Sequence, residues 1–281
     1  MWWILILLMP VVILLWLLYE WIEHTWIQYN TTIVECQKLP TNKEIKICLI
    51  TDLHNNKKNL CRISQKLKGF QPELVLLAGD MIDKHKTSNN YAEQFLQTLS
   101  SLQIPVYYSP GNHELSLQEN YPDLWQAYLK RLPEYVHYLD NETVVTALDN
   151  RLYISGLSLS KQFYQKGKLY NVPEEMPELK VPDNSFHILM AHNPEYAELY
   201  KKYHADFIVS GHLHGGLLRL PFIGGIVSPR LRLPKGCDAG LLQLSDGCSI
   251  FVSRGLGSHT IPLRFFNRVE INFLVLKGTK E

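Results

Sequence analysis

Short apolar runs that stop abruptly at aspartate, histidine or asparagine recur along this chain, and they constrain its fold more than any other feature. The first three runs are interpreted as buried strands: 45–51, 73–78 and 104–108. The stretches at 59–69 and 91–102 between them are interpreted as helices. This alternation of strand and helix predicts an α/β architecture, in which polar groups gather at the carboxyl ends of the strands.

The rest of the chain continues with shorter elements. Helices are expected at 121–132 and 194–203, the second with a proline near its first turn. Further strands are expected at 143–147, 151–156, 186–190 and 207–209. The last apolar runs are interpreted as closing strands of a second sheet: 241–244, 249–253 and 269–276. A polar stretch with several prolines, 161–182, is expected to form an irregular loop near the site or a partial lid.

Polar side chains follow five of these strands where each strand ends. In chain order they are Asp52, His54, Asp80, Asp83, Asn112, His113, His192, His212 and His214. The i, i+2 spacing of His212 and His214 puts both imidazoles on one face of an extended segment. Mixed Asp, Asn and His ligands suit Mn, Fe or Zn, and two such ions can share a bridging carboxylate. Asp and Asn also cap helices, but capping alone does not account for five ordered motifs.

The motifs themselves resemble those of a known family. DLH (52–54), GDMID (79–83), GNHE (111–114), AHNP (191–194) and GHLH (211–214) match the calcineurin-like metallophosphoesterases in order, and the resemblance covers roughly residues 45–277. The stretches 215–229 and 252–271 look like the membrane-anchored bacterial subgroup similar to YkuE and YaeI. The resemblance implies a four-layer α/β/β/α sandwich. No ligand position departs from the family pattern.

The resemblance also implies a role for each site residue. One metal ion would be held by Asp52, His54, Asp80 and His214. Asp80 would bridge to a second metal ion, held also by Asn112, His192 and His212. His113 would face the substrate phosphate as general acid or as a stabiliser of developing charge, with Asp83 orienting it. A hydroxide bridging the two ions would attack in line. Arg219 and Arg264 could bind phosphate, or they could pair structurally.

The N-terminus has a different character. Residues 1–19 contain no charge, and about 20 apolar residues are needed to span a bilayer. Aromatic residues lie near both ends of this run, as in interfacial belts: Trp2, Trp3, Trp16, Tyr19 and Trp21. A cleaved signal peptide would need a basic start and a small-residue cleavage site, and neither is present. We therefore expect a single-pass transmembrane anchor at 1–22, a juxtamembrane connector at 23–44 and a metallophosphoesterase domain at 45–281.

The side of the cell membrane that carries the domain stays open. Lys38, Lys43 and Lys46 favour the cytoplasmic side, but large domains can translocate regardless of such a bias. The net charge of +1, with no block of like charge, excludes an electrostatic footprint for nucleic acid. The five scattered cysteines include no CxxC pair, which argues against a zinc ribbon or redox motif. No obligate protein partner is evident.

The segment after the last two histidines, 215–235, is unusually apolar. Its apolar residues are Leu217, Leu218, Leu220, Phe222, Ile223, Ile226 and Val227. It could pack on the domain, or it could dip into the bilayer interface beside the anchor and admit a lipid-linked substrate. The expected function is a membrane-anchored, dinuclear-metal phosphoesterase acting on phosphoester or pyrophosphate bonds. Its substrate could be lipid-linked, of the UDP-2,3-diacylglucosamine type. Alternatively, the protein could be a broad phosphodiesterase on small or cell-envelope substrates. An alternative of another class is a non-catalytic, membrane-tethered binding domain that contains metal.

Overall fold

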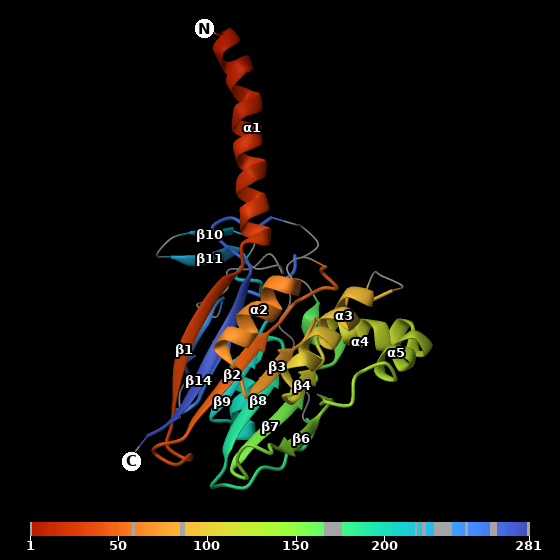
Figure 1. The fold of residues 1–281 in the computed structure, drawn as a ribbon, viewed down its shortest axis with the longest axis vertical. Coiled ribbons are helices and arrows are strands. Elements are labelled where there is room, and N and C mark those ends of the chain that lie inside the picture. The colour runs from red at the N-terminus through yellow and green to blue at the C-terminus, as the bar shows by residue number, and fades with distance from the viewer. Residues whose placement is uncertain are drawn as a thin grey trace.

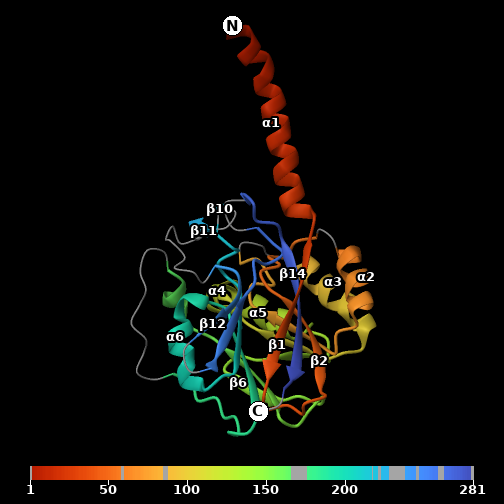
Figure 2. The same cartoon turned by 90° about the vertical axis from the view of Figure 1, so that its left-hand side faces the viewer.

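In the computed structural model, two mixed sheets pack face to face and helices cover their outer faces (Figures 1 and 2). The structure describes residues 2–57, 60–84, 88–165, 176–216, 218–220, 223–227, 238–244, 247–258 and 263–279. Within these residues each of the two large sheets has six strands. Parts of the segments expected at 59–69, 161–182 and 215–235 lie outside the described residues, including Asn59, Leu217 and Phe222.

The first sheet has the strand order β1-β14-β2-β3-β4-β5. Its strands are β1 (Gln28–Cys36), β14 (Glu270–Gly278), β2 (Glu44–Ile50), β3 (Leu74–Ala78), β4 (Val106–Ser109) and β5 (Val136–Tyr138). From β2 to β5 the strands run parallel, whereas β14 is antiparallel to β2. The parallel part is continuously apolar because both of its faces are covered, as β3 illustrates with every residue buried.

The second sheet has the order β12-β13-β9-β8-β7-β6. Its strands are β12 (Gly240–Gln243), β13 (Ser249–Val252), β9 (Phe207–Ser210), β8 (Phe186–Ala191), β7 (Leu152–Leu157) and β6 (Glu142–Val145). The four central strands are parallel, and both edge strands are antiparallel to their neighbours. A small hairpin, β10 (Leu218–Leu220) with β11 (Gly224–Val227), stands apart near the N-terminal helix (Figure 1).

Helices complete the four layers. The first sheet is covered by α2 (Leu60–Phe70), α3 (Asn90–Leu99), α4 (Asn112–Asn120) and α5 (Pro122–Leu129), with the short turn η1 (Ser100–Leu102) after α3. The second is covered by η2 (Lys161–Tyr164), η3 (Pro194–Tyr196), α6 (Ala197–Tyr200) and η4 (Lys201–Tyr203). Alternate residues of β3 face different apolar clusters: Val75 packs towards the helices, and Leu76 packs between the sheets. The predicted α/β/β/α sandwich is confirmed.

Helix α1 (Trp2–Thr25) projects away from the sandwich (Figures 1 and 2). Its residues Leu8–Thr25 are long and apolar enough to cross a membrane, which makes α1 a candidate membrane helix. Most of its side chains from Leu8 to Leu18 are exposed to the surroundings. Only the last turns touch the domain, where the Tyr19 ring packs against Phe265 and Phe266.

Two elements differ from the sequence-based expectation. The segment 23–44, expected as a connector, contains β1, which pairs in parallel with β14 along its whole length. In addition, β14 was expected in the second sheet and lies in the first, between β1 and β2. The side chains of β14 explain its place in the first sheet. Phe273 stacks on Phe70 of α2, a helix that covers this sheet, at 4.0 Å, while Leu274 faces the cluster between the sheets.

Other differences are local. The GNHE motif opens a helix, α4, that the apolar pattern did not indicate because the helix is short and mostly polar. The single helix expected at 194–203 is divided into η3, α6 and η4. The described part of the apolar segment 215–235 contains the β10–β11 hairpin, for which the sequence analysis predicted no secondary structure.

Candidate metal centre

The predicted site residues meet at one edge of the sandwich, where strands of both sheets end. Asp52 and His54 follow β2, Asp80 follows β3, and Asn112 and His113 open α4 after β4. His192 follows β8, and His212 and His214 follow β9. The two sheets therefore contribute from opposite sides. Asp52, Asp80, His192, His212 and His214 are all buried.

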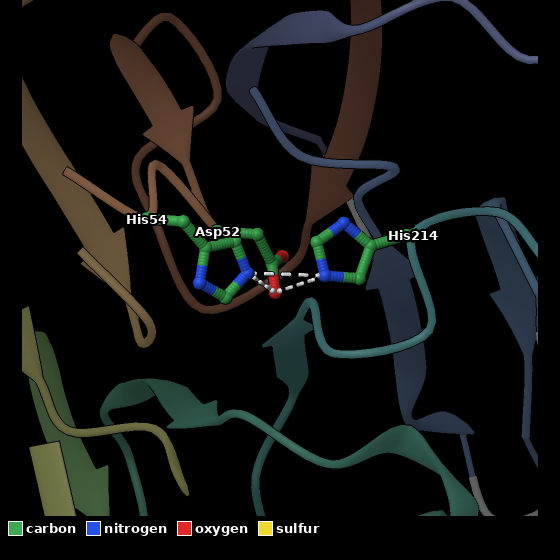
Figure 3. A group of neighbouring side chains, drawn as sticks. All are labelled: Asp52, His54 and His214. Atoms are coloured by element: carbon green, nitrogen blue, oxygen red, sulfur yellow. Dashed lines mark hydrogen bonds and ion pairs between the residues drawn. The ribbon is translucent and has the colours of Figure 1, made fainter. Parts of the chain in front are cut away.

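Asp52, His54 and His214 form a first ligand group (Figure 3). Nε2 of His54 lies 3.2 Å from Nε2 of His214, and Nε2 of His214 lies 3.5 Å from Oδ1 of Asp52. Nε2 of His54 lies 4.0 Å from the same carboxylate oxygen. All three side chains thus present potential ligand atoms to one small volume.

Asp80, His192 and His212 form a second ligand group. Nε2 of His192 lies 3.2 Å from Oδ2 of Asp80. The other ring nitrogen, Nδ1, donates to the backbone carbonyl of Ala78 at 2.7 Å. This hydrogen bond fixes the ring and turns Nε2 towards the site, where the neutral form of the imidazole would offer its lone pair to a metal ion.

Asp80 lies between the two groups. Its Oδ2 is 4.0 Å from Nε2 of His54 and also 4.0 Å from Nε2 of His113. Together with the 3.2 Å contact to His192, this puts one carboxylate within reach of side chains of both groups. A shared carboxylate in this position suits a dinuclear centre.

Asn112 tests whether the site fits a metal ion. Its Oδ1 atom is buried and has no hydrogen-bond partner among the residues that the structure describes, although buried amide oxygens ordinarily have one. The preceding Gly111 packs so closely that a Cβ atom there would lie 2.4 Å from Asp80 Oδ1 and 2.9 Å from Cδ2 of His192. The residue before Asn112 therefore packs against Asp80 and His192 of the second ligand group. The Asn112 amide oxygen, buried and without a hydrogen-bond partner among the described residues, is suited to bind a metal ion there.

The backbone around the ligands is unusual. Asp52, His54, Asp80, His212 and His214 all have φ between 50° and 67°, in the left-handed region that residues other than glycine rarely adopt. Each such conformation costs on the order of 1–3 kcal/mol and persists only where the surroundings enforce it. Strain of this kind concentrated on the predicted ligands indicates a functional site.

Burial and the neighbouring charges shift the pKa values of three residues of the site. Burial raises the pKa of Asp52 to about 7, although His192 opposes the shift. Burial acts in the same direction on Asp80, but His192 and His113 outweigh it and hold the pKa of Asp80 well below its usual range. Burial would lower the pKa of His192, yet Asp80 and Asp52 raise it to about 10. The buried carboxylates therefore require positive charge beside them, which divalent cations can supply.

His113 lies beside both groups at the start of α4. Its backbone N–H donates to Asp80 Oδ1 at 2.8 Å, and its Nδ1 accepts from the backbone N–H of Lys84 at 3.1 Å. The proton of the neutral ring is then on Nε2, which faces the site. Asp83 Oδ1 lies 3.8 Å from the same Nδ1, where it could pair only with a protonated ring. The Lys84 N–H is therefore the group that orients the neutral ring.

Glu114 is a site residue to which the sequence interpretation gave no role. Its side chain is fully buried, and its carboxylate accepts from a set of nearby donors: the N–H groups of Asp80, Met81, Ile82 and Gly111, and the Tyr108 hydroxyl. Glu114 thereby clamps the loop that carries Asp80 to the start of α4. Its place as the third residue of a helix, bonded back to the N-cap N–H, is a recognisable sequence signal.

The two arginines singled out in the sequence take structural partners. Arg264 is buried and donates to the backbone carbonyls of Arg254, Gly257 and Asn267. Arg219 pairs with Asp238. For both residues the structural interpretation holds.

Comparison with known proteins agrees with this geometry. The sequence profile of the family described as "Calcineurin-like phosphoesterase" matches residues 45–216. An uncharacterized metallophosphoesterase of Aquifex aeolicus is 26% identical over 267 residues, which cover 92% of this chain and 95% of the relative. The uncharacterized metallophosphoesterase YkuE of Bacillus subtilis is 29% identical, over 74% of this chain and 69% of YkuE. A Bos taurus "Transmembrane protein with metallophosphoesterase domain" is 26% identical, over 85% of this chain and 54% of the relative.

Because the profile matches more than half of its residues, the chain belongs to the calcineurin-like phosphoesterase family. The resemblance inferred from the five motifs is confirmed. The protein is a metal-dependent phosphoric ester hydrolase, and its clustered Asp and His side chains suggest a dimetal site.

Proposed function

We propose that the protein is a membrane-anchored phosphoesterase with two divalent metal ions, Mn, Fe or Zn, and that it hydrolyses a lipid-linked phosphoester or pyrophosphate. The observation that carries the proposal is Asp80, which lies within 4.0 Å of histidine nitrogens on both sides of it. The first ion would be held by Asp52, His54, Asp80 and His214, and the second by Asp80, Asn112, His192 and His212. Bound divalent ions supply Lewis-acid activation of a water molecule and of the phosphoryl oxygens.

His113 and the groups that orient it would assist the reaction at the metal centre. His113 presents a protonated Nε2 towards the site, so it can donate that proton or a hydrogen bond to the leaving oxygen. The Lys84 N–H holds the ring from its far side, and Asp83, 3.8 Å from the same nitrogen, would stabilise a protonated form of the ring. Burial of the ligands excludes bulk water and strengthens each of these interactions.

The arrangement of α1 supports retention of the helix as a single-pass anchor in the cell membrane. Glu23, near the end of the helix, is only 4% exposed and bonds with the domain, and β1 begins three residues after the helix ends. Removal of the helix as a signal peptide would withdraw these contacts. Trp21 and Trp26, near the same end of the helix, are both exposed, as expected at a membrane interface.

A lipid-linked substrate is favoured by the surface around this helix base. Exposed apolar side chains gather on the β10–β11 hairpin and on the segment beside it: Leu218, Ile223, Leu263, Phe265 and Phe266. Ile223 is 73% exposed and Phe266 50%. Figures 1 and 2 show the hairpin beside the base of α1, at the end of the sandwich where the parallel strands finish. An acyl chain leaving the bilayer would meet this surface before the metal centre.

A substrate panel tests the proposal on the full chain in detergent. We expect two metal ions per chain by elemental analysis, and turnover of a glycolipid pyrophosphate of the UDP-2,3-diacylglucosamine type. His113→Ala should lower kcat by about 10²–10⁴ while the metal content stays at two. Unchanged turnover would remove His113 from the mechanism, and lack of turnover on every phosphoester would favour a non-catalytic binding domain.

The apolar surface has its own test. Ile223→Ser should raise KM for the glycolipid by about tenfold and leave hydrolysis of bis(p-nitrophenyl) phosphate unchanged. An exposed apolar residue far from the hairpin, Val145, provides the matched control as Val145→Ser. Equal activity of all variants on the glycolipid would instead support the second candidate, a broad phosphodiesterase of small or cell-envelope substrates.

A further inference from the structure

The base of α1 is joined to the first ligand group by one short stretch of chain, residues 263–269. Successive backbone N–H groups of this stretch donate to α1: Arg264 to Glu20, Phe266 to Tyr19, and Asn267 and Val269 to Glu23. Backbone donors in the interior must find partners, and here the helix provides them in place of a neighbouring strand. The conformation of 263–269 is thus set by the end of α1.

Glu23 is an unexpected residue at this point. A carboxylate near the C-terminal end of a helix faces the negative end of the helix dipole, and burial adds a further cost. The cost is offset by the Asn267 N–H, which donates to the carboxylate, and by Arg268, whose Nε lies 3.6 Å away. A buried charge with these partners fixes the orientation of the helix end on the domain.

Asn267 contacts both the helix and the turn that presents His214. Its side chain is fully buried, and its Nδ2 donates to the carbonyl of His214 at 2.6 Å and to that of Gly216 at 2.7 Å. His214, Gly215 and Gly216 all have positive φ, so the turn that presents His214 is left-handed throughout. A single amide group therefore bridges a strained turn whose first residue is a predicted metal ligand.

Arg264 reaches the same ligand group from another direction. Its Nη2 donates to the carbonyl of Gly257 at 2.6 Å and lies 3.3 Å from Nδ1 of His214. Gly257 in turn donates from its N–H to the carbonyl of Asp52 at 2.6 Å. A Cβ atom at Gly257 would lie 3.0 Å from Cδ2 of His54. Arg264 therefore supports the loop against which Asp52 and His54 pack.

We propose that the base of α1 is a positioning element of the first ligand group, acting through Asn267 and Arg264. Docking of Glu20 and Glu23 fixes residues 263–269, and these fix the backbone of His214 and the loop behind Asp52. The inference rests on the proposed dinuclear site and adds a dependence on the helix. Metal affinity at the first group responds to the helix base, whereas the second group has other supports and does not.

Metal titration of the full chain in detergent micelles tests this inference. The metal-stripped protein is titrated with Mn²⁺ by calorimetry, and two binding events are expected for the wild type. Glu23→Ala should weaken one event by about 10–100-fold and leave the other unchanged, as for groups that orient a metal ligand. Glu23→Gln keeps an acceptor for the Asn267 N–H and should retain most of the affinity. Glu35→Ala, which removes an exposed carboxylate of β1, is the matched control and should change neither event.

A second variant separates the outcomes. Asn267→Leu removes both side-chain donors while it keeps the number of side-chain heavy atoms, and it should weaken the same event as Glu23→Ala. The inference is overturned if both events weaken equally, if neither changes, or if the two variants affect different events. A wild type that binds fewer than two Mn²⁺ ions contradicts the proposed dinuclear function itself, a result that needs no variant. Thermal melting of each variant, read by circular dichroism, shows that the compared proteins are folded.

Discussion

The two ligand groups of the metal centre are held in different ways. Asp80 and His192, of the second group, are fixed by the interior of the sandwich, through Glu114 and the carbonyl of Ala78. His214, of the first group, takes its backbone contacts from Asn267, at the rim of the domain beside α1. The second ligand group is therefore held by the interior of the sandwich, whereas the first depends on contacts between residues 263–269 and α1.

The most drastic way to break this comparison is to remove the residue that both groups share. Asp80→Asn keeps the size of the side chain and removes its charge, so both ions should be lost or weakened by more than about 100-fold. We expect turnover of bis(p-nitrophenyl) phosphate to fall by at least about 10³-fold. Elemental analysis and steady-state kinetics provide the measurements. Retention of two ions would show that Asp80 is not shared.

Substitution of each histidine of the GHLH motif sharpens the comparison. His212→Ala should remove the ion of the second group and His214→Ala that of the first, so each variant should keep about one ion. In the double variant neither ion should bind with the affinity of the wild type. Mn²⁺ titration of the three proteins distinguishes the cases. If both single variants lost the same ion, the assignment of one histidine to each group would be wrong.

Glu114 is the counterpart of Asn267 on the core side. Glu114→Gln leaves an amide NH₂ facing backbone N–H donors, and each unsatisfied donor costs about 1–3 kcal/mol, for a loss of stability on the order of 2–4 kcal/mol. We expect the metal affinity of the second group to fall by about 10-fold and that of the first to change less. Urea unfolding and Mn²⁺ titration measure the two effects. Glu119→Gln, at an exposed position of the same helix, is the control.

The smallest effect on the metal centre is expected from substitution of His187, a buried histidine far from the site. Burial lowers the pKa of His187 from 6.5 to about 4, and its ring bonds to Ser155 and to the Tyr203 carbonyl. The unfolded chain therefore takes up a proton more readily than the folded one, so stability is lost as the pH falls from about 6.5 to about 4. The loss amounts to about 3 kcal/mol.

His187→Gln removes this titration. Its urea midpoint should depend less on pH between 7 and 4.5 than that of the wild type, while the metal content at pH 7 stays the same. An identical pH dependence in the two proteins would assign the acid sensitivity to other groups.

The sequence predicted which polar residues meet at one edge of the sandwich better than it predicted the sheets. Asp52, Asp80 and His192 could be located because apolar runs end directly before them, and parallel strands bring such ends together. The sheet to which β14 belongs could not be read from the sequence, because its pairing with β1 joins residues about 240 positions apart. The hydrophobic pattern within a strand does not indicate which distant strand it pairs with.

The supporting residues were harder to find for a related reason. Glu114, Asn267 and Arg264 act on backbone groups, which are alike at every position and leave no complementary signal in the sequence. The GNHE motif contains Glu114, but its role follows only from the donors that surround it. The amphipathic helices α2 and α3, by contrast, were predicted within about three residues because their burial is local.

The pairing of β1 with β14 also has a consequence for how the protein is made. Among the described strands β1 pairs only with β14, and α1 docks on residues 263–269, so α1 and β1 lack these partners until residues 263–278 have been synthesised. We expect α1 to enter the bilayer while its partners are still unsynthesised, since domains fold as their chain emerges and long-range pairing is slow. A nascent chain stopped short of Glu270 would hold an incomplete first sheet. The first sheet is therefore completed only after the candidate membrane helix has been synthesised and residues 270–278 have followed it.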